Sequence, residues 1–130
     1  MARQTVKQLV KAGINPNGAH ALILGFTFKE NCPDVRNTKV IDVVNELESF
    51  SINVEIHDPL APRQVVEREH GRDLIENPKA HQYDLVFLAV PHEEFVAVEE
   101  QDLFRYLRSE ESVFVDLKGM LRSPRVTWSL

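Results

Sequence analysis

Apolar residues along the chain follow two spacings, one typical of buried strands and one typical of amphipathic helices. Short apolar segments predict strands over residues 21–24, 84–90 and 112–116, and the alternating segment 52–57 predicts another that stops at Asp58-Pro59. Helical spacing predicts helices over 2–13, 38–50 and 62–70, with helical pieces within 92–108. Residues 126–128 could form a last short strand.

The alternation of strands and helices predicts the fold class. Successive strands lie roughly 25–30 residues apart, the spacing that right-handed parallel β-α-β units require. We therefore predict an α/β, three-layer, Rossmann-like parallel sheet of four or five strands in the order 2-1-3-4(-5), with helices on both faces. In such a sheet, ligands bind at the carboxyl ends of the strands. Those ends are predicted at 25–27, 57–58, 90–92 and 116–118.

Composition and charge narrow the class of protein. A length of 130 residues with 43% hydrophobic and 27% charged residues fits one globular domain. A formal net charge of −5 argues against a general nucleic-acid binder. No apolar run is long enough for a bilayer, and no signal peptide is evident. The single cysteine, Cys32, fits a reducing compartment. The expectation is a cytoplasmic protein with neither nucleic acid nor membrane as a partner.

The loop after the first predicted strand carries the candidate chemistry. Gly25 ends the strand, Lys29 and Arg36 lie in the loop, and Asp34 or Asn37 could cap the following helix. Cations beside a helix start suit an anionic ligand. The glycine patterns of dinucleotide-binding turns and of Walker loops are both absent. The alternative is a surface loop with solvated charges, in which Asp34 pairs with Arg36.

The loop, and three segments that follow it in order, resemble a known family. Residues 25–40 read Gly-Phe-Thr-Phe-Lys-Glu-Asn-Cys-Pro-Asp-Val-Arg-Asn-Thr-Lys-Val. This is similar to the signature of the C-terminal, UDP-binding domain of the UDP-glucose/GDP-mannose dehydrogenase family, and most resembles its bacterial UDP-N-acetylhexosamine 6-dehydrogenase branch. The segments 54–59, 84–95 and 113–119 agree with it. The matching loop positions are Gly25, Phe28, Lys29, Asp34, Arg36 and Thr38.

The resemblance implies a function and a role for individual residues. Members oxidise the C6 alcohol of a UDP-sugar to a carboxylate with NAD and a nucleophilic cysteine, in the synthesis of surface polysaccharide precursors. By this resemblance, Phe28, Lys29 and Lys118 would bind the UDP-sugar, although arginine is frequent at the last position. Arg36 would contact NAD that is held mainly by another domain. No residue of the chain is assigned as catalytic, and no metal site is expected.

The resemblance also predicts a domain organisation. Residues 1–18 would be the end of an interdomain helix with its turn, and residues 19–130 the UDP-binding domain. The family's N-terminal NAD-binding domain and its middle helical domain with the nucleophilic cysteine have no counterpart in this sequence, and Cys32 is not that cysteine. We therefore expect a fragment that is inactive alone, whose partners are a UDP-sugar, the rest of its own polypeptide and, at full length, a second subunit.

Two other classes of protein are alternatives. One is a stand-alone nucleotide-binding or signalling module of flavodoxin-like topology, such as a receiver domain. The strand ends at Leu24-Gly25 and Val90-Pro91 lack the acidic residues that a receiver needs. The other is a complete small NAD-binding protein, which the missing glycine turn disfavours. Asp58, which ends the second strand, is expected to serve as a turn residue before Pro59.

Overall fold

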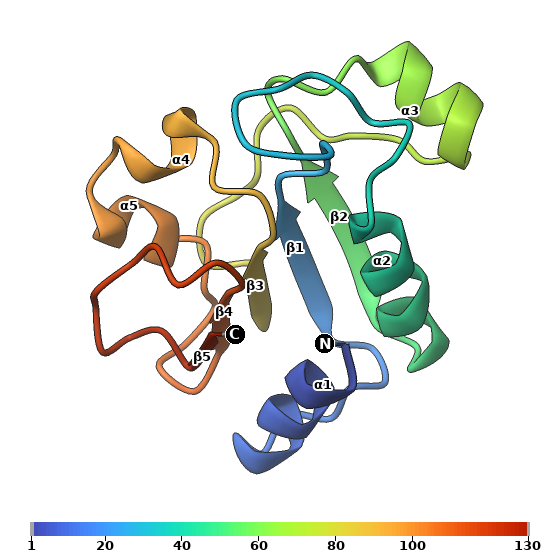
Figure 1. Cartoon of the computed structure of the whole chain (residues 1–130). Helices are drawn as coiled ribbons and strands as arrows, with labels where there is room; N and C mark the ends of the chain where they lie inside the picture. The colour runs from blue at the N-terminus through green and yellow to red at the C-terminus, as the bar shows by residue number, and fades with distance from the viewer. Residues whose placement is uncertain (1, 130) are drawn as a thin grey trace.

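A computed structural model describes residues 2–129 and contains a five-stranded parallel sheet in the order β2-β1-β3-β4-β5 (Figure 1). This confirms the predicted fold class and strand order. The strands are β1 (His20–Leu24), β2 (Asn53–His57), β3 (Leu85–Leu88), β4 (Val113–Asp116) and β5 (Trp128–Ser129). The strand predicted over 84–90 is shorter than expected, because the N–H groups of Ala89 and Val90 both turn to the carbonyl of Leu24.

The helices lie on both sides of the sheet, as predicted. Figure 1 shows α4 and α5 on one side and α1 and α2 on the other, with α3 beyond the tip of β2. Their bounds are α1 (Ala2–Lys11), α2 (Val40–Ser49), α3 (Arg63–His70), α4 (Glu93–Val96) and α5 (Glu100–Phe104). None of the helices within residues 2–129 is long and apolar enough to cross a membrane.

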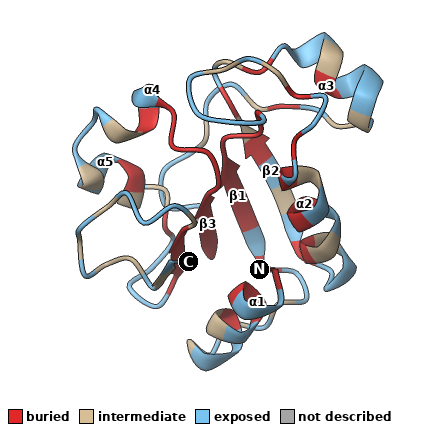
Figure 2. Cartoon of the chain, viewed as in Figure 1, coloured by how far each residue is buried: buried red, intermediate tan, exposed pale blue. Residues whose placement is uncertain are grey.

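Alternation along the strands divides the buried side chains into two cores. On one face, Ile23 and Phe87 pack with the apolar sides of α1, α2 and α3. On the other face, Leu24, Leu88 and Phe114 pack with the segment that contains α4 and α5. Both faces of β1, β3 and β4 are therefore covered, which explains their nearly continuous apolar sequences (Figure 2).

The start of α2 differs from the prediction. The helix begins at Val40, and neither Asp34 nor Asn37 caps it. The hydroxyl of Thr38 instead accepts a hydrogen bond from the Val40 N–H at 3.2 Å. Asp34 lies too far before the helix to reach its first turn, and its carboxylate accepts from the Arg36 N–H at 3.0 Å.

Gly25 sits where the chain leaves β1 and passes close to the chain that leaves β3. Its φ is +92°, a conformation that side chains disfavour. A Cβ atom at this position would lie 2.6 Å from both the carbonyl oxygen and the Cβ of Val90. Because two of the three atoms nearest to it belong to the Val90 main chain, no rotamer change can relieve the clash. This close approach brings the β1 loop against the end of β3.

The substitution Gly25→Ala should destabilise the fold by roughly 2–5 kcal/mol, from backbone strain and overpacking together. Gly18→Ala is the matched control, because Gly18 also has a positive φ of +86° but no atom within 4 Å of an added Cβ. It should cost only about 1 kcal/mol. Urea unfolding of the two variants measures the difference, and equal losses would show that the contact with Val90 is unimportant.

Candidate functional site

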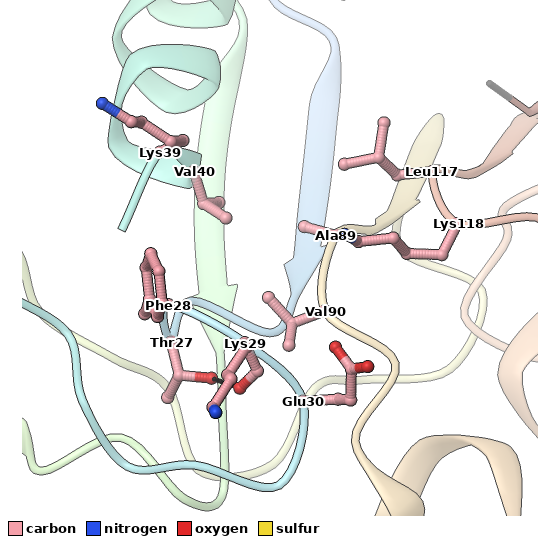
Figure 3. A pocket seen from close by; sticks show the side chains of 10 residues that line it. All are labelled: Thr27, Phe28, Lys29, Glu30, Lys39, Val40, Ala89, Val90, Leu117 and Lys118. Carbon is pink, nitrogen blue, oxygen red and sulfur yellow. Dashed lines mark hydrogen bonds between the residues drawn. The ribbon is translucent and has the colours of Figure 1, made fainter. Parts of the chain in front are cut away.

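The carboxyl edge of the sheet contains a hollow of about 270 Å³ that collects residues from four parts of the chain (Figure 3). Phe28 and Lys29 enter from the loop after β1, and Leu117 and Lys118 from the end of β4. The full lining consists of Thr27, Phe28, Lys29, Glu30, Lys39, Val40, Ala89, Val90, Leu117 and Lys118. The structure thus brings together the three residues predicted to bind substrate, although Lys118 follows Phe28 by 90 positions in the sequence.

The hollow combines an apolar floor with cations. Val40, Ala89 and Val90 supply aliphatic surface between the β1 loop and the end of β4 (Figure 3). Phe28 is 55% exposed, which is unusual for a phenylalanine and leaves its ring available for contact. Lysine ammonium groups beside an apolar surface suit a ligand that has both a phosphate and an aromatic or sugar part.

Lys39 is a lining residue that the sequence analysis did not single out. It directly precedes α2, which brings it to the rim of the hollow together with Val40. In Figure 3 its side chain points away from the other lining residues. Its position after Thr38 was visible in the sequence, but nothing in the spacing showed that the start of α2 and the end of β4 border the same hollow.

Arg36, the predicted cofactor-binding residue, lies apart from this hollow. Its guanidinium Nε is 3.5 Å from a carboxylate oxygen of Asp34, and its side chain is 69% exposed. The ion pair that the alternative interpretation expected is therefore present. Arg36 lines a shallower depression with Cys32 and Pro62. The structure separates the predicted cofactor-binding residue from the predicted substrate-binding residues.

A buried hydrogen-bond network underlies the loop that carries Phe28 and Lys29. One carboxylate oxygen of Asp58, at the end of β2, accepts hydrogen bonds from the N–H groups of Phe26 at 2.6 Å and Thr27 at 3.2 Å. The same oxygen lies 2.9 Å from Nε2 of His92, which follows β3. The side chains of Asp58 and His92 are both fully buried. Since β2 and β3 flank β1, this pair bridges the end of β1.

The second oxygen of Asp58 organises its own turn. It accepts from the N–H groups of Leu60 at 2.8 Å and Ala61 at 3.1 Å, which confirms the expected turn role. Burial alone would raise the pKa of Asp58, but the hydrogen bonds from His92 and from the N–H groups of Phe26 and Leu60 outweigh it and hold the pKa below its usual range. Asp58 is therefore a carboxylate at neutral pH.

Sequence reasoning missed the network because its members are far apart in the chain. Asp58 and His92 are 34 residues apart, and each follows a different strand. The available signal was that the carboxyl ends of strands flanking β1 meet at one edge. Across residues 2–129, histidines, cysteine and carboxylates nowhere gather in a group of three that could hold a metal ion.

Asp58→Asn should destabilise the fold by roughly 3 kcal/mol at pH 7, because an amide cannot accept on both of its atoms. The pKa of Asp58 is depressed in the folded state, so its stabilisation is present above the unfolded pKa of about 3.9 and is lost as the pH falls through the folded value. The gap between wild type and variant should therefore narrow in acid. Denaturant unfolding at pH 7 and about pH 3 measures it.

Asp73→Asn provides the control for this experiment. The Asp73 side chain is 89% exposed, and its bond to Arg63 lies at the surface. Its replacement should change the stability by less than about 1 kcal/mol. A loss for Asp58→Asn that equals the control, or that stays constant with pH, would contradict the role given to the buried carboxylate.

Bacterial nucleotide-sugar dehydrogenases are among the known proteins that resemble the chain in sequence. The chain is 43% identical over 121 residues to a UDP-N-acetyl-D-glucosamine 6-dehydrogenase of Salmonella typhi. The match covers 93% of this chain and 28% of that protein. It is 42% identical over 118 residues to the protein of the same name from Pseudomonas aeruginosa, and this match covers 91% of the chain and 28% of the relative. The chain thus spans less than a third of the length of these relatives.

Solved structures share the fold. A UDP-D-ManNAc dehydrogenase from Pyrococcus horikoshii superposes with a TM-score of 0.76 at 20% identity, over 98% of this chain and 29% of that one. An NDP-N-acetyl-D-galactosaminuronic acid dehydrogenase from Methanosarcina mazei Go1 gives 0.77 at 18% identity, over 92% and 25%. At these identities the likeness shows the fold alone.

The family model extends over the site. The UDP binding domain of the UDP-glucose/GDP-mannose dehydrogenase family matches residues 22–123, which contain the last three residues of β1, all of β2 to β4, the loop after β1 and the whole lining of the hollow. With this match and the bacterial relatives above 40% identity, the chain belongs to the UDP-glucose/GDP-mannose dehydrogenase family and carries its UDP binding domain.

Proposed function

We propose that the chain supplies the UDP-sugar-binding part of an NAD-dependent dehydrogenase that oxidises the C6 alcohol of a UDP-N-acetylhexosamine to a carboxylate. The observation that carries the proposal is the hollow at the carboxyl edge, where Phe28, Lys29 and Lys118 converge within the matched UDP binding domain. The names of the bacterial relatives support the sugar class. Surface polysaccharide precursors are the corresponding products.

The two lysines, Phe28 and the aliphatic floor have separate chemical roles in this proposal. Lys29 and Lys118 approach the hollow from opposite sides and neutralise the diphosphate (Figure 3). The exposed ring of Phe28 packs on the flat face of the base or the sugar. The aliphatic floor formed by Val40, Ala89 and Val90 excludes water beneath the ligand.

Arg36 serves the cofactor in this proposal. Its exposed guanidinium lies in a separate depression, where it can reach a phosphate or ribose of NAD presented by another part of the polypeptide. In this arrangement residues 1–18 end an interdomain helix, and residues 19–130 form the UDP-binding domain. The nucleophilic cysteine and the NAD fold belong to other domains, so the fragment alone is inactive and the full-length enzyme is a cytoplasmic homodimer.

The lysines provide the direct test. Lys29→Ala and Lys118→Ala should each weaken binding of UDP-N-acetylglucosamine to the chain by roughly tenfold, since each removes a charge-assisted contact to phosphate. Titration calorimetry or NMR measures the affinity, and added salt should weaken wild-type binding more than binding by the variants. Lys11→Ala is the control, because Lys11 is an exposed lysine on α1 outside the hollow. Absence of wild-type binding at millimolar ligand would refute the site.

Arg36→Ala should separate the two roles. Binding of UDP-N-acetylglucosamine to the chain should change by less than about twofold, because Arg36 lies outside the hollow. In a polypeptide that also contains the NAD-binding domain, the same change should raise the KM for NAD. An equal effect on both ligands would contradict the separate assignment of Arg36 to the cofactor.

A further inference from the structure

The buried ring of His92 is bonded at both of its nitrogens. Nδ1 lies 2.9 Å from the backbone nitrogen of Asn31, which can only donate its hydrogen. Nδ1 is therefore the acceptor and carries no proton. Nε2 carries the ring proton and faces the Asp58 carboxylate at 2.9 Å and the Thr27 hydroxyl at 3.2 Å. These contacts select the neutral imidazole with its hydrogen on Nε2.

The two loop residues bonded to this ring enclose the segment that lines the hollow. Thr27 and Asn31 flank residues 28–30, all three of which are exposed. The Thr27 hydroxyl donates to the Lys29 carbonyl at 2.9 Å, inside the segment. The Asn31 side-chain oxygen accepts from the Glu93 N–H at 2.8 Å. The backbone of Asn31 has a φ of 60°, a left-handed conformation that asparagine tolerates. One imidazole therefore fixes both ends of the segment.

We propose that His92 is a positioning residue which, as the neutral Nε2–H tautomer, holds residues 28–30 in place beside the nucleotide-sugar hollow, and that protonation of its ring releases this segment. The consequence for ligand binding rests on the function proposed above. A protonated ring has a hydrogen on Nδ1, which opposes the Asn31 N–H donor to donor. The Asn31 bond is then lost, and the end of the segment that contains Lys29 and Glu30 is freed.

The charged groups around the ring confine this change to the Nδ1 side. Asp58, from the end of β2, accepts from Nε2 in either protonation state of His92. The loop contributes the exposed Lys29 and Glu30, and α4 the exposed Glu93 and Glu94. From α4 the ring of Phe95, with its centroid 5.8 Å away, packs on the imidazole. Among these contacts, the bond to Asn31 is the one that protonation breaks.

The first test uses the wild-type chain without ligand. Nitrogen-15 NMR at neutral pH should show His92 with its proton on Nε2 and an acceptor at Nδ1. As acid protonates the ring, the amide signals of residues 27–31 should shift together with the His92 ring signals. A proton on Nδ1 at neutral pH, or amide signals that do not follow the ring, would overturn the proposal.

The second test divides the two ring nitrogens between two variants. In His92→Asn the amide oxygen occupies the place of Nδ1 and accepts from Asn31, whereas the bond to Asp58 is lost. In His92→Gln the amide nitrogen occupies the place of Nε2 and donates to Asp58, whereas the Asn31 N–H is left unpaired. His20→Gln is the control, because His20 is an exposed histidine at the amino end of β1.

The affinity for UDP-N-acetylglucosamine is then measured at two pH values, one on either side of the change in the His92 ring signals. This ligand is suitable because its pyrophosphate diester does not titrate in that range. Wild type and His20→Gln should weaken roughly three- to tenfold at the lower pH, the equivalent of one hydrogen bond. His92→Asn should bind like neutral wild type at both values, and His92→Gln should bind weakly at both.

The outcomes separate the two proposals. If His92→Gln binds as tightly as wild type, or if wild-type affinity does not depend on pH, the positioning role is wrong. If wild type binds no nucleotide-sugar at all, the function proposed above fails, while the ligand-free titration still decides whether His92 holds the segment. If a variant does not fold, that titration, which needs no substitution, gives the decision.

Discussion

The hydrogen bond between Asp58 and His92 is the interaction on which the rest of the carboxyl edge depends. The two residues follow the strands on either side of β1, and their side chains meet across its end at 2.9 Å. The Asp58 carboxylate also accepts from the first N–H groups after Gly25. A buried charge is tolerated only when its hydrogen bonds are satisfied, so Asp58 determines where the loop leaves the sheet.

The shape of the hollow depends on how these buried contacts place the loop after β1. Gly25 allows the main chain after β1 to approach Val90, which itself lines the hollow. Phe28 and Lys29 belong to the loop whose neighbouring residues bond to Asp58 and His92. Lys118 comes from the end of β4, on the other side of the hollow. Exposed side chains are thus placed by buried groups, which is how a loop can present a binding surface of defined shape.

Much of the fold was predictable because the apolar pattern along each strand matches how far that strand is covered in the sheet. Continuous apolar runs appear in β1, β3 and β4, which are covered on both faces, and the alternating pattern marks the edge strand β2. The capping residue of α2 was predicted wrongly: Asp34 and Asn37 were both chemically suited to the role, but the N-cap position is occupied by Lys39, and the Val40 N–H bonds to the hydroxyl of Thr38. Choosing among several capping residues requires the backbone path of the preceding loop.

The sequence by itself determined the α/β class, the strand order, the loop with its lysine and arginine, and the resemblance to a family, because each of these depends on residues near one another or in a fixed succession. The tertiary structure decided which of these residues act together. It placed Lys118 at the same hollow as Phe28 and Lys29, put Arg36 in a different depression, and joined Asp58 to His92. These are contacts between the ends of separate strands, and only the packing of the sheet sets the distances between them.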